Sequence, residues 1–250
     1  MYYYIIDLGN KQIAKMKEKI EMMMASFGIS GDFGKISPLS SAYDLAKRAI
    51  SQNYSTIVAI GDNEIINQVA QALANSEAAM GIVPINAEET ICDLIGTNGI
   101  KQALEILRTR KIQTIDLGKV TESKYFLTRA IIKNNKPIST VLDFGRFKIG
   151  GDFQEIIISN GTKTNKSFRD GLFEIKIDKE RQSKSFWNFF KKPTFSSSVF
   201  YQESVKIETE KPSELKIGKE TVAKTPTEIT LLPFALKLIV TRIQPQTKNS

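Results

Sequence analysis

Residues 57–73 read IVAIGDNEIINQVAQAL. The apolar residues before Gly61 predict a buried strand, Gly61 and Asp62 predict a tight turn, and the apolar spacing after Asn63 predicts a helix. A strand that passes through a glycine turn into a helix presents backbone N–H groups at the helix N-terminus, where many α/β proteins bind phosphate. The stretch therefore predicts an α/β domain with a candidate phosphate-binding turn.

The segments around this stretch repeat the alternation of apolar runs and helical patterns. Strand, helix and strand at this spacing indicate a parallel sheet that helices cover on both faces. The sequence predicts strands at residues 2–7, 55–60, 80–85 and 114–117, and helices at residues 11–27, 40–50, 63–75 and 98–109.

The character of the sequence changes near Lys124. Beyond it the apolar runs are short, alternate with polar residues and are separated by turn signals such as IGGD, SNGT and RDGL. The predicted architecture is therefore α/β plus β, with an N-terminal α/β domain at residues 1–123 and an antiparallel β-sandwich at residues 124–232. Strands of the second domain are predicted at residues 155–159, 172–177, 196–201, 205–209, 228–232 and 236–241.

The composition excludes several chemistries. The 250 residues include no histidine and one cysteine, which rules out histidine-based catalysis, histidine-bound zinc and an internal disulfide. The single cysteine fits a reducing cytoplasm, and we expect no membrane-spanning helix because no apolar run is long enough. The net charge of +8 suits an anionic partner, but the lysines form no dense block, which argues against nucleic acid.

Five landmarks follow one another along the chain: IVAIGDNEIINQVAQAL, GIVPINAEETICDLIG, ALEILRTRKIQTIDLGKV, NGTKTNKSFRDGLFEIKI and KPSELKIGKETVAKTPTEITLLPFALKLIV. In this order and spacing, the chain from Tyr3 as far as Val240 resembles the diacylglycerol kinase catalytic family, which includes bacterial lipid kinases and relatives of the sphingosine kinases. Its first domain is also similar to the Rossmann-like domain of the NAD kinases.

The resemblance implies both a fold and an activity. The first domain would carry a nucleotide loop, the β-sandwich would close over it, and residues 233–250 would return to the first domain. The family transfers the γ-phosphate of ATP to a lipid hydroxyl with Mg²⁺. For this chain the resemblance implies a lipid or an anionic membrane surface as partner, a cytoplasmic or peripheral location at the inner membrane face, and a dimer.

The nucleotide loop departs from the family pattern G-G-D-G-T. Two glycines that would let backbone N–H groups approach phosphates are lost, although Asn63 tolerates a left-handed turn. Glu64 puts an anion at the helix N-terminus, where a phosphate would bind. Together with Asn86 of the second loop, these residues predict a weak or vestigial nucleotide site; the loop itself is Ile60, Gly61, Asp62, Asn63 and Glu64.

Two further motifs depart from the family. The second loop, P-L-G-T-G-N-D-F-A in the family, reads PINAEETIC at residues 84–92, so that its glycines are lost and Glu88 and Glu89 are present. A carboxylate roughly 4–6 Å from a triphosphate costs on the order of 1 kcal/mol or more, unless Mg²⁺ bridges the two. The acidic motif D-G-E reads IGK at residues 217–219, with Glu220 one residue out of register. One hypothesis is that Glu88, Glu89 or Glu220 replaces a lost metal ligand.

Two acidic residues of the family survive. Asp62 is the candidate catalytic base, although we favour the alternative that it caps the following helix. Asp116, in the sequence IDLG, is the candidate metal ligand, and a structural carboxylate at a strand end is an equal alternative.

The stretch SFWNFFKKPTF combines aromatic residues with a lysine pair. Trp187 and Phe190 are candidate contacts to an anionic membrane. We favour the alternative that these aromatics cover the core of the β-sandwich.

Three hypotheses of function follow. The favoured one is a pseudokinase with a binding or regulatory role, as a homodimer or with an intact relative, because three parts of the site have lost the residues that phosphoryl transfer needs. The second is an active ATP-dependent lipid kinase that relies on Asp62. The third is a membrane-surface or protein-binding module that uses no nucleotide.

Overall fold

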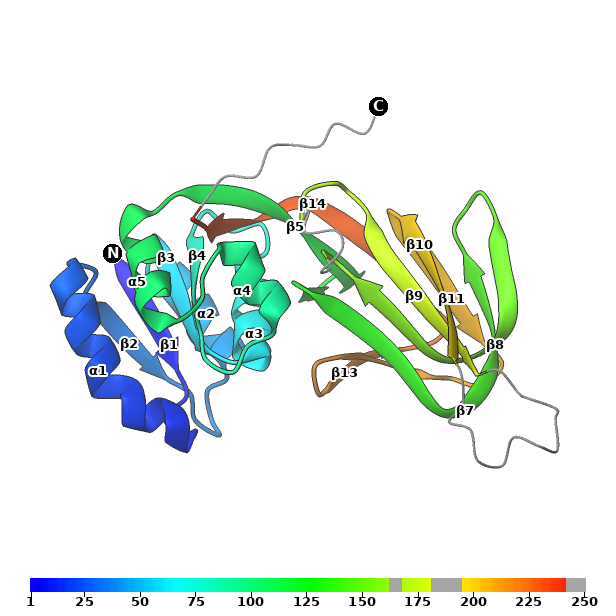
Figure 1. Ribbon diagram of the computed structural model, residues 1–250, viewed down its shortest axis with the longest axis horizontal. Helices are drawn as coiled ribbons and strands as arrows, with labels where there is room; N and C mark the ends of the chain where they lie inside the picture. The colour runs from blue at the N-terminus through cyan, green and yellow to red at the C-terminus, as the bar shows by residue number, and fades with distance from the viewer. Residues whose placement is uncertain (162–167, 181–194, 242–250) are drawn as a thin grey trace.

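The structure is a computed structural model that describes residues 1–161, 168–180 and 195–241. Figure 1 shows an α/β domain at one end and a domain built of strands at the other. Two long strands, β5 (Ile112–Thr121) and β14 (Thr227–Ile239), run between them. The predicted fold class, α/β plus antiparallel β, is confirmed.

The N-terminal domain alternates strands and helices. Its elements are β1 (Tyr2–Ile6), α1 (Lys11–Phe27), β2 (Gly31–Lys35), α2 (Ala42–Ser51), β3 (Thr56–Gly61), α3 (Asn63–Leu73), β4 (Ala79–Pro84), α4 (Glu89–Ile95) and α5 (Ile100–Thr109). The parallel strands lie in the order β2–β1–β3–β4. One face of this sheet packs against α2, α3 and α4, and the other packs against α1 and α5.

The second domain is antiparallel. Its elements are β6 (Lys124–Phe126), β7 (Arg129–Asp143), β8 (Lys148–Ser159), β9 (Phe173–Glu180), β10 (Phe195–Gln202), β11 (Ser204–Thr209), β12 (Glu214–Ile217) and β13 (Glu220–Lys224). The main ladder runs β10–β9–β8–β7–β11–β14, and its apolar side chains form a core of their own.

Strand β14 connects the two sheets. It pairs with β11 in the β domain, and its residue Leu238 pairs with Met80 of β4 in the α/β domain. The separate strands expected at residues 228–232 and 236–241 are therefore one strand, with an irregularity between Leu232 and Leu236. The hydrogen-bonded ladder is thus continuous from one domain to the other.

Candidate functional site

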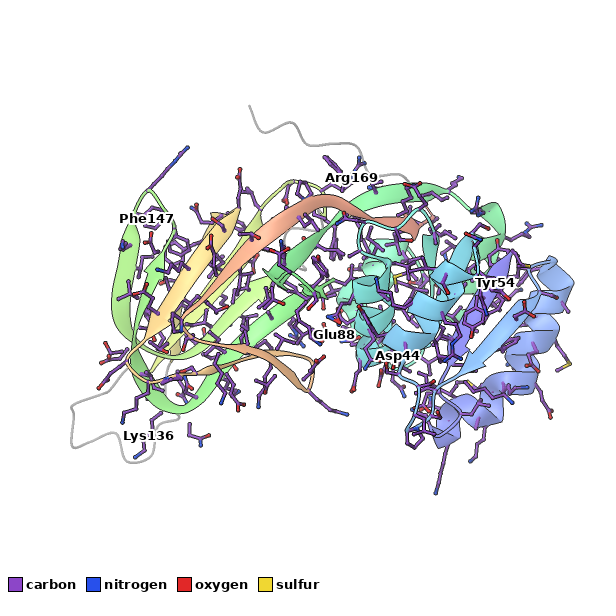
Figure 2. The ribbon with its side chains drawn as sticks, turned by 180° about the vertical axis from the view of Figure 1, so that it is seen from behind. Asp44, Tyr54, Glu88, Lys136, Phe147 and Arg169 are labelled. Atoms are coloured by element: carbon purple, nitrogen blue, oxygen red, sulfur yellow. The ribbon has the colours of Figure 1, made fainter. Side chains whose placement is uncertain are left out.

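The two loops expected to hold a nucleotide lie at the carboxyl ends of β3 and β4. Ligands bind at this edge in open α/β sheets. Here the edge faces the β domain, and Glu88 of the second loop lies at the junction of the two domains (Figure 2). A nucleotide held by these loops would therefore sit between the domains.

Asp62 is the N-cap of α3, as we favoured from the sequence. Its Oδ1 accepts hydrogen bonds from the backbone N–H groups of Glu64 and Ile65, at 3.1 and 3.2 Å. These N–H groups have no partner within the helix, so a capping carboxylate stabilises its first turn. Two of the N–H groups that would face a phosphate at this helix end are therefore already bonded to Asp62.

Asn63 and Asn86 hold the two loops in place. Asn63 is the first residue of α3 and does not adopt the left-handed conformation that an asparagine tolerates. Its Oδ1 accepts a hydrogen bond from the Glu88 N–H at 2.8 Å, which ties the two loops together. The left-handed residue is Asn86, with φ of 58°, at a position where the family has glycine. Its Nδ2 donates to Oε1 of Gln12 at 2.9 Å.

Two ion pairs cross from these loops to the β domain. Glu64 Oε2 lies 3.6 Å from Nζ of Lys219, which is in the turn between β12 and β13. Glu88 Oε1 pairs with Nη2 of Arg129 at the start of β7. We call these two pairs the cleft clasp. The Lys219 side chain is 90% exposed and the other three side chains are partly exposed, so each pair contributes little to stability. Each pair nevertheless places a protein cation beside a carboxylate where a nucleotide would bind.

A buried hydrogen bond reinforces the same junction. Asn67 of α3 is 8% exposed, and its Oδ1 accepts a hydrogen bond from the Leu127 N–H, just before β7, at 3.0 Å. Its Nδ2 donates to the carbonyl oxygen of Asn63 at 2.9 Å. Burial strengthens such a bond, so the domains are joined by a directional contact as well as by the clasp.

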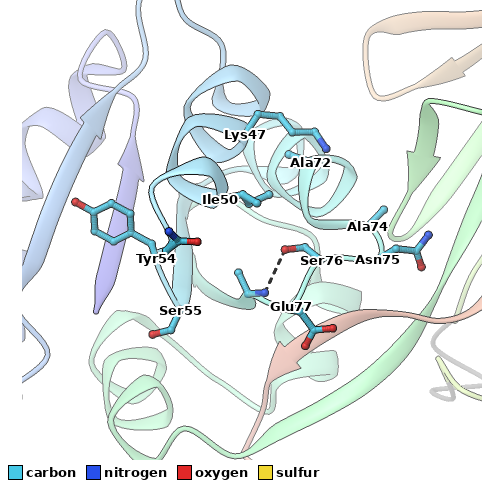
Figure 3. Close-up of a pocket in the computed structure, with 11 residues that line it drawn as sticks. Lys47, Ile50, Tyr54, Ser55, Ala72, Ala74, Asn75, Ser76 and Glu77 are labelled. Atoms are coloured by element: carbon cyan, nitrogen blue, oxygen red, sulfur yellow. Dashed lines mark hydrogen bonds between the residues drawn. The ribbon is translucent and has the colours of Figure 1, made fainter.

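The space beside Glu64 is small. A cavity of about 30 Å³ lies between α3 and the turn at Gly218, with room for a water molecule or two. A more open pocket of about 520 Å³ lies between the C-terminal ends of α2 and α3, near Ser55 and Ser76 (Figure 3). That pocket is at the amino ends of β3 and β4, away from both loops, so it is not the expected nucleotide site.

The carboxylates considered as replacement metal ligands do not converge. Glu220 pairs with Lys124 at the start of β6, Glu88 belongs to the clasp, and Glu89 lies in the first turn of α4. Among the residues that the structure describes, no three acidic, cysteine or histidine side chains form a group that could hold a metal.

Asp116 is a buried carboxylate that holds three segments together. It is 1% exposed, and its Oδ1 and Oδ2 accept hydrogen bonds from the N–H groups of Phe234 and Gly171, at 2.9 and 3.2 Å. Burial raises the pKa of this carboxyl, and the two hydrogen bonds oppose that shift. Both oxygens of the candidate metal ligand thus bind backbone donors.

The predicted membrane contacts lie outside the described residues. Trp187 and Phe190 belong to residues 181–194, so their role stays a prediction. No helix in the described ranges is long and apolar enough to cross a membrane.

Known proteins share sequence and structural similarity with this chain. Residues 7–120 match the family model of the diacylglycerol kinase catalytic domain. The chain is diacylglycerol kinase-like. No curated protein matches its sequence significantly.

Solved structures extend the likeness to both domains of this diacylglycerol kinase-like chain. Two structures from Bacillus anthracis str. Sterne, described as candidate diacylglycerol kinases, superpose with a TM-score of 0.79 at 15% and 16% identity. They cover 96% of this chain, which spans 97% and 96% of theirs. A third, described as a diacylglycerol kinase from the same organism, has a TM-score of 0.75 at 16% identity, with 96% of each chain covered. Identities this low support the fold alone.

The clasp can be tested by charge reversal. Arg129→Glu is expected to lower the free energy of unfolding by about 1 kcal/mol, because it sets two carboxylates against each other at a partly exposed site. Adding Glu88→Arg is expected to restore most of the loss, as measured by urea unfolding of the single and double variants. Lys136→Glu, an exposed change far from the junction (Figure 2), is the control. Additive effects of the two changes would show that the pair is not formed.

Proposed function

We propose that this diacylglycerol kinase-like protein is a pseudokinase with a binding or regulatory role. The observation that carries the proposal is the contact between Glu64 and Lys219. Glu64 stands where the family loop has threonine, and Lys219 stands where the D-G-E motif has glutamate. Relative to the family, the Glu64 carboxylate replaces a hydroxyl on one side of the cleft, and the Lys219 ammonium replaces a carboxylate on the other. These two replaced side chains form an ion pair with each other.

The electrostatics of the loops support the same conclusion. A triphosphate placed at α3 would face the carboxylate of Glu64 and would compete with it for Lys219. At the second loop it would compete with Glu88 for Arg129 in the same way. Phosphoryl transfer depends on cations and donors arranged around the phosphates before the reaction. Here the cations at both loops are neutralised by glutamates of the protein itself.

The hydrogen bonds at the N-terminus of α3 also support the pseudokinase proposal. Phosphate binding at such an end uses free backbone N–H groups. The N–H groups of Glu64 and Ile65 donate to Asp62, and the N–H of Glu88 donates to Asn63. A nucleotide that used these three N–H groups would first have to displace their bonds within the protein.

Calorimetric titration of MgATP into the purified protein tests this proposal. We expect no binding at millimolar nucleotide, and no transfer of radiolabelled phosphate to diacylglycerol in vesicles. The control is Asp62→Asn, which can keep the helix cap while it removes the charge. Binding in the micromolar to sub-millimolar range that Asp62→Asn abolishes would overturn the proposal in favour of an active lipid kinase.

A further inference from the structure

Strand β10 lies at one end of the hydrogen-bonded ladder. Along its eight residues it pairs with β9, and among the residues that the structure describes no strand pairs with its other edge. An edge strand presents a row of backbone N–H and C=O groups to which another strand can bond. Residues 197–199 and Tyr201 are exposed, so this part of β10 is accessible to a partner.

The other end of the ladder shows how this chain protects an edge. Strand β2 has five residues and carries Asp32 and Lys35. Short edge strands and charged side chains are common means by which proteins prevent an edge from pairing with another chain. Strand β10 is longer, reads FSSSVFYQ, and contains no charged residue, proline or glycine. The protection that β2 has is therefore missing from the sequence of β10.

The exposed side chains of β10 are apolar beside a charged neighbour. Val199 is 43% exposed and Tyr201 is 46% exposed. In the ladder they lie opposite Lys176 and Glu174 of β9, and directly opposite residues of an antiparallel pair share one face of the sheet. On this face the charges belong to β9, and the apolar side chains lie at the edge, where a further strand would cover them.

The opposite face of β10 holds the strand in place. The ring of Phe200 packs against those of Phe144 and Phe147, with centroids 5.8 and 6.5 Å apart. Phe144 belongs to the core of the β domain. A strand that is already ordered loses little conformational entropy when it binds a partner. The edge of β10 is thus preformed for pairing.

A second copy of β10 fits this edge. A two-fold axis perpendicular to the sheet sets the two copies antiparallel, which is the symmetry of the commonest protein dimers. With Val199 on the axis, each Val199 lies opposite its counterpart and each Ser197 lies opposite Tyr201. Like charges opposite each other destabilise such pairs, and β10 contains no charges. Glu203, the next residue, would lie opposite the neutral Phe195.

We propose that the chain forms a symmetric dimer in which β10 pairs antiparallel with β10 of a second copy. The ladder that joins the two domains of one chain then continues into the other chain, with the α/β domains at the far ends. A homodimer is among the assemblies that the sequence suggests, and β10 gives it a location. The inference does not depend on the pseudokinase proposal, because no residue of the nucleotide loops belongs to β10.

Analytical ultracentrifugation over a concentration series tests the dimer. Pairing through one edge strand makes a small interface, so we expect a reversible dimer, with an average mass that rises from one chain to two as the concentration increases. Val199→Lys places two like charges opposite each other and is expected to raise the dissociation constant about tenfold or more. Val141→Lys is the matched control, because Val141 is 38% exposed but lies in β7, which pairs with strands on both sides. It is expected to dimerise as the wild type does.

A cysteine cross-link tests the register and does not depend on the lysine variant. Directly opposite residues of an antiparallel pair have Cα atoms roughly 4.5–5.5 Å apart, which suits a disulfide. In a Cys92→Ser background, Val199→Cys is expected to give a covalent dimer under a mild oxidant, and Val141→Cys is expected to stay a single chain. Both products are read on a non-reducing gel.

Three results would overturn the proposal. The first is a wild-type protein that stays a single chain up to its highest soluble concentration. The second is a folded Val199→Lys protein that dimerises as tightly as the wild type, because the interface would then lie elsewhere. The third is a Val199→Cys protein that forms no more covalent dimer than Val141→Cys, because Val199 would then not face its own copy.

Discussion

Gly118→Val is expected to lower the free energy of unfolding by about 3 kcal/mol or more, through overpacking of the core. Gly118 of β5 lies directly opposite Phe126 of β6. A Cβ at this position would be 2.1 Å from Cζ of the Phe126 ring. That ring is 1% exposed and stacks on Phe173 with centroids 5.7 Å apart. The ring is therefore closely packed, and relieving the clash would disturb the core around it.

Urea unfolding of the purified variant measures this effect. Gly150→Val is the matched control, because Gly150 lies in β8 and no heavy atom lies within 4 Å of a Cβ built there. If ring crowding is the cause, Phe126→Leu should recover part of the stability of Gly118→Val although it is destabilising in the wild type. A Gly118→Val protein as stable as the Gly150→Val control would contradict this account of β5.

The parallel sheet could be predicted because its central strands are apolar throughout. Every residue of β3 and β4 is buried, which gives the continuous apolar runs typical of strands covered on both faces. Strand β2 reads GDFGK and lies at the edge of the sheet. Its two glycines and two charged residues have low strand propensity, so the sequence does not predict this strand. Helix α4 has seven residues inside a loop motif, which is too short for a clear helical period.

The nucleotide loops could be located from the sequence, but their contacts could not. Each loop directly follows a strand that the local sequence predicts, so the position of the loop in the fold follows from the position of the strand. Lys219 and Arg129, the cations of the clasp, belong to the other domain, and no local pattern relates them to Glu64 or Glu88. The sequence did contain one signal. Glu64 replaces the threonine of the family loop and Lys219 replaces the glutamate of the D-G-E motif, so a new anion and a new cation arise together and could pair.

Asp116→Ala is expected to lower the free energy of unfolding by about 2–4 kcal/mol, because the backbone N–H groups of Phe234 and Gly171 would be left without their acceptor. Asp116→Asn is expected to cost less, since its amide oxygen can still accept one of the two bonds. Thermal and urea unfolding measure both variants, with the exposed Asp152→Ala as control. Mg²⁺ is expected to leave the stability of the wild type and of all three variants unchanged. A magnesium-dependent stabilisation confined to the wild type would instead make Asp116 a metal ligand.

The pH dependence of the same variants gives an independent test of this role. Burial raises the pKa of Asp116 in the folded protein above its ordinary value of 3.8, so the folded state takes up the proton more readily than the unfolded chain. Stability from this group is then fully present below pH 3.8 and is lost as the pH rises through the folded pKa. Asp116→Asn does not titrate here, so the stability gap between the wild type and this variant should widen as the pH falls from neutral. A carboxylate that binds a metal ion has a lowered pKa and would make the gap shrink on acidification, so the sign of the change decides between the two roles.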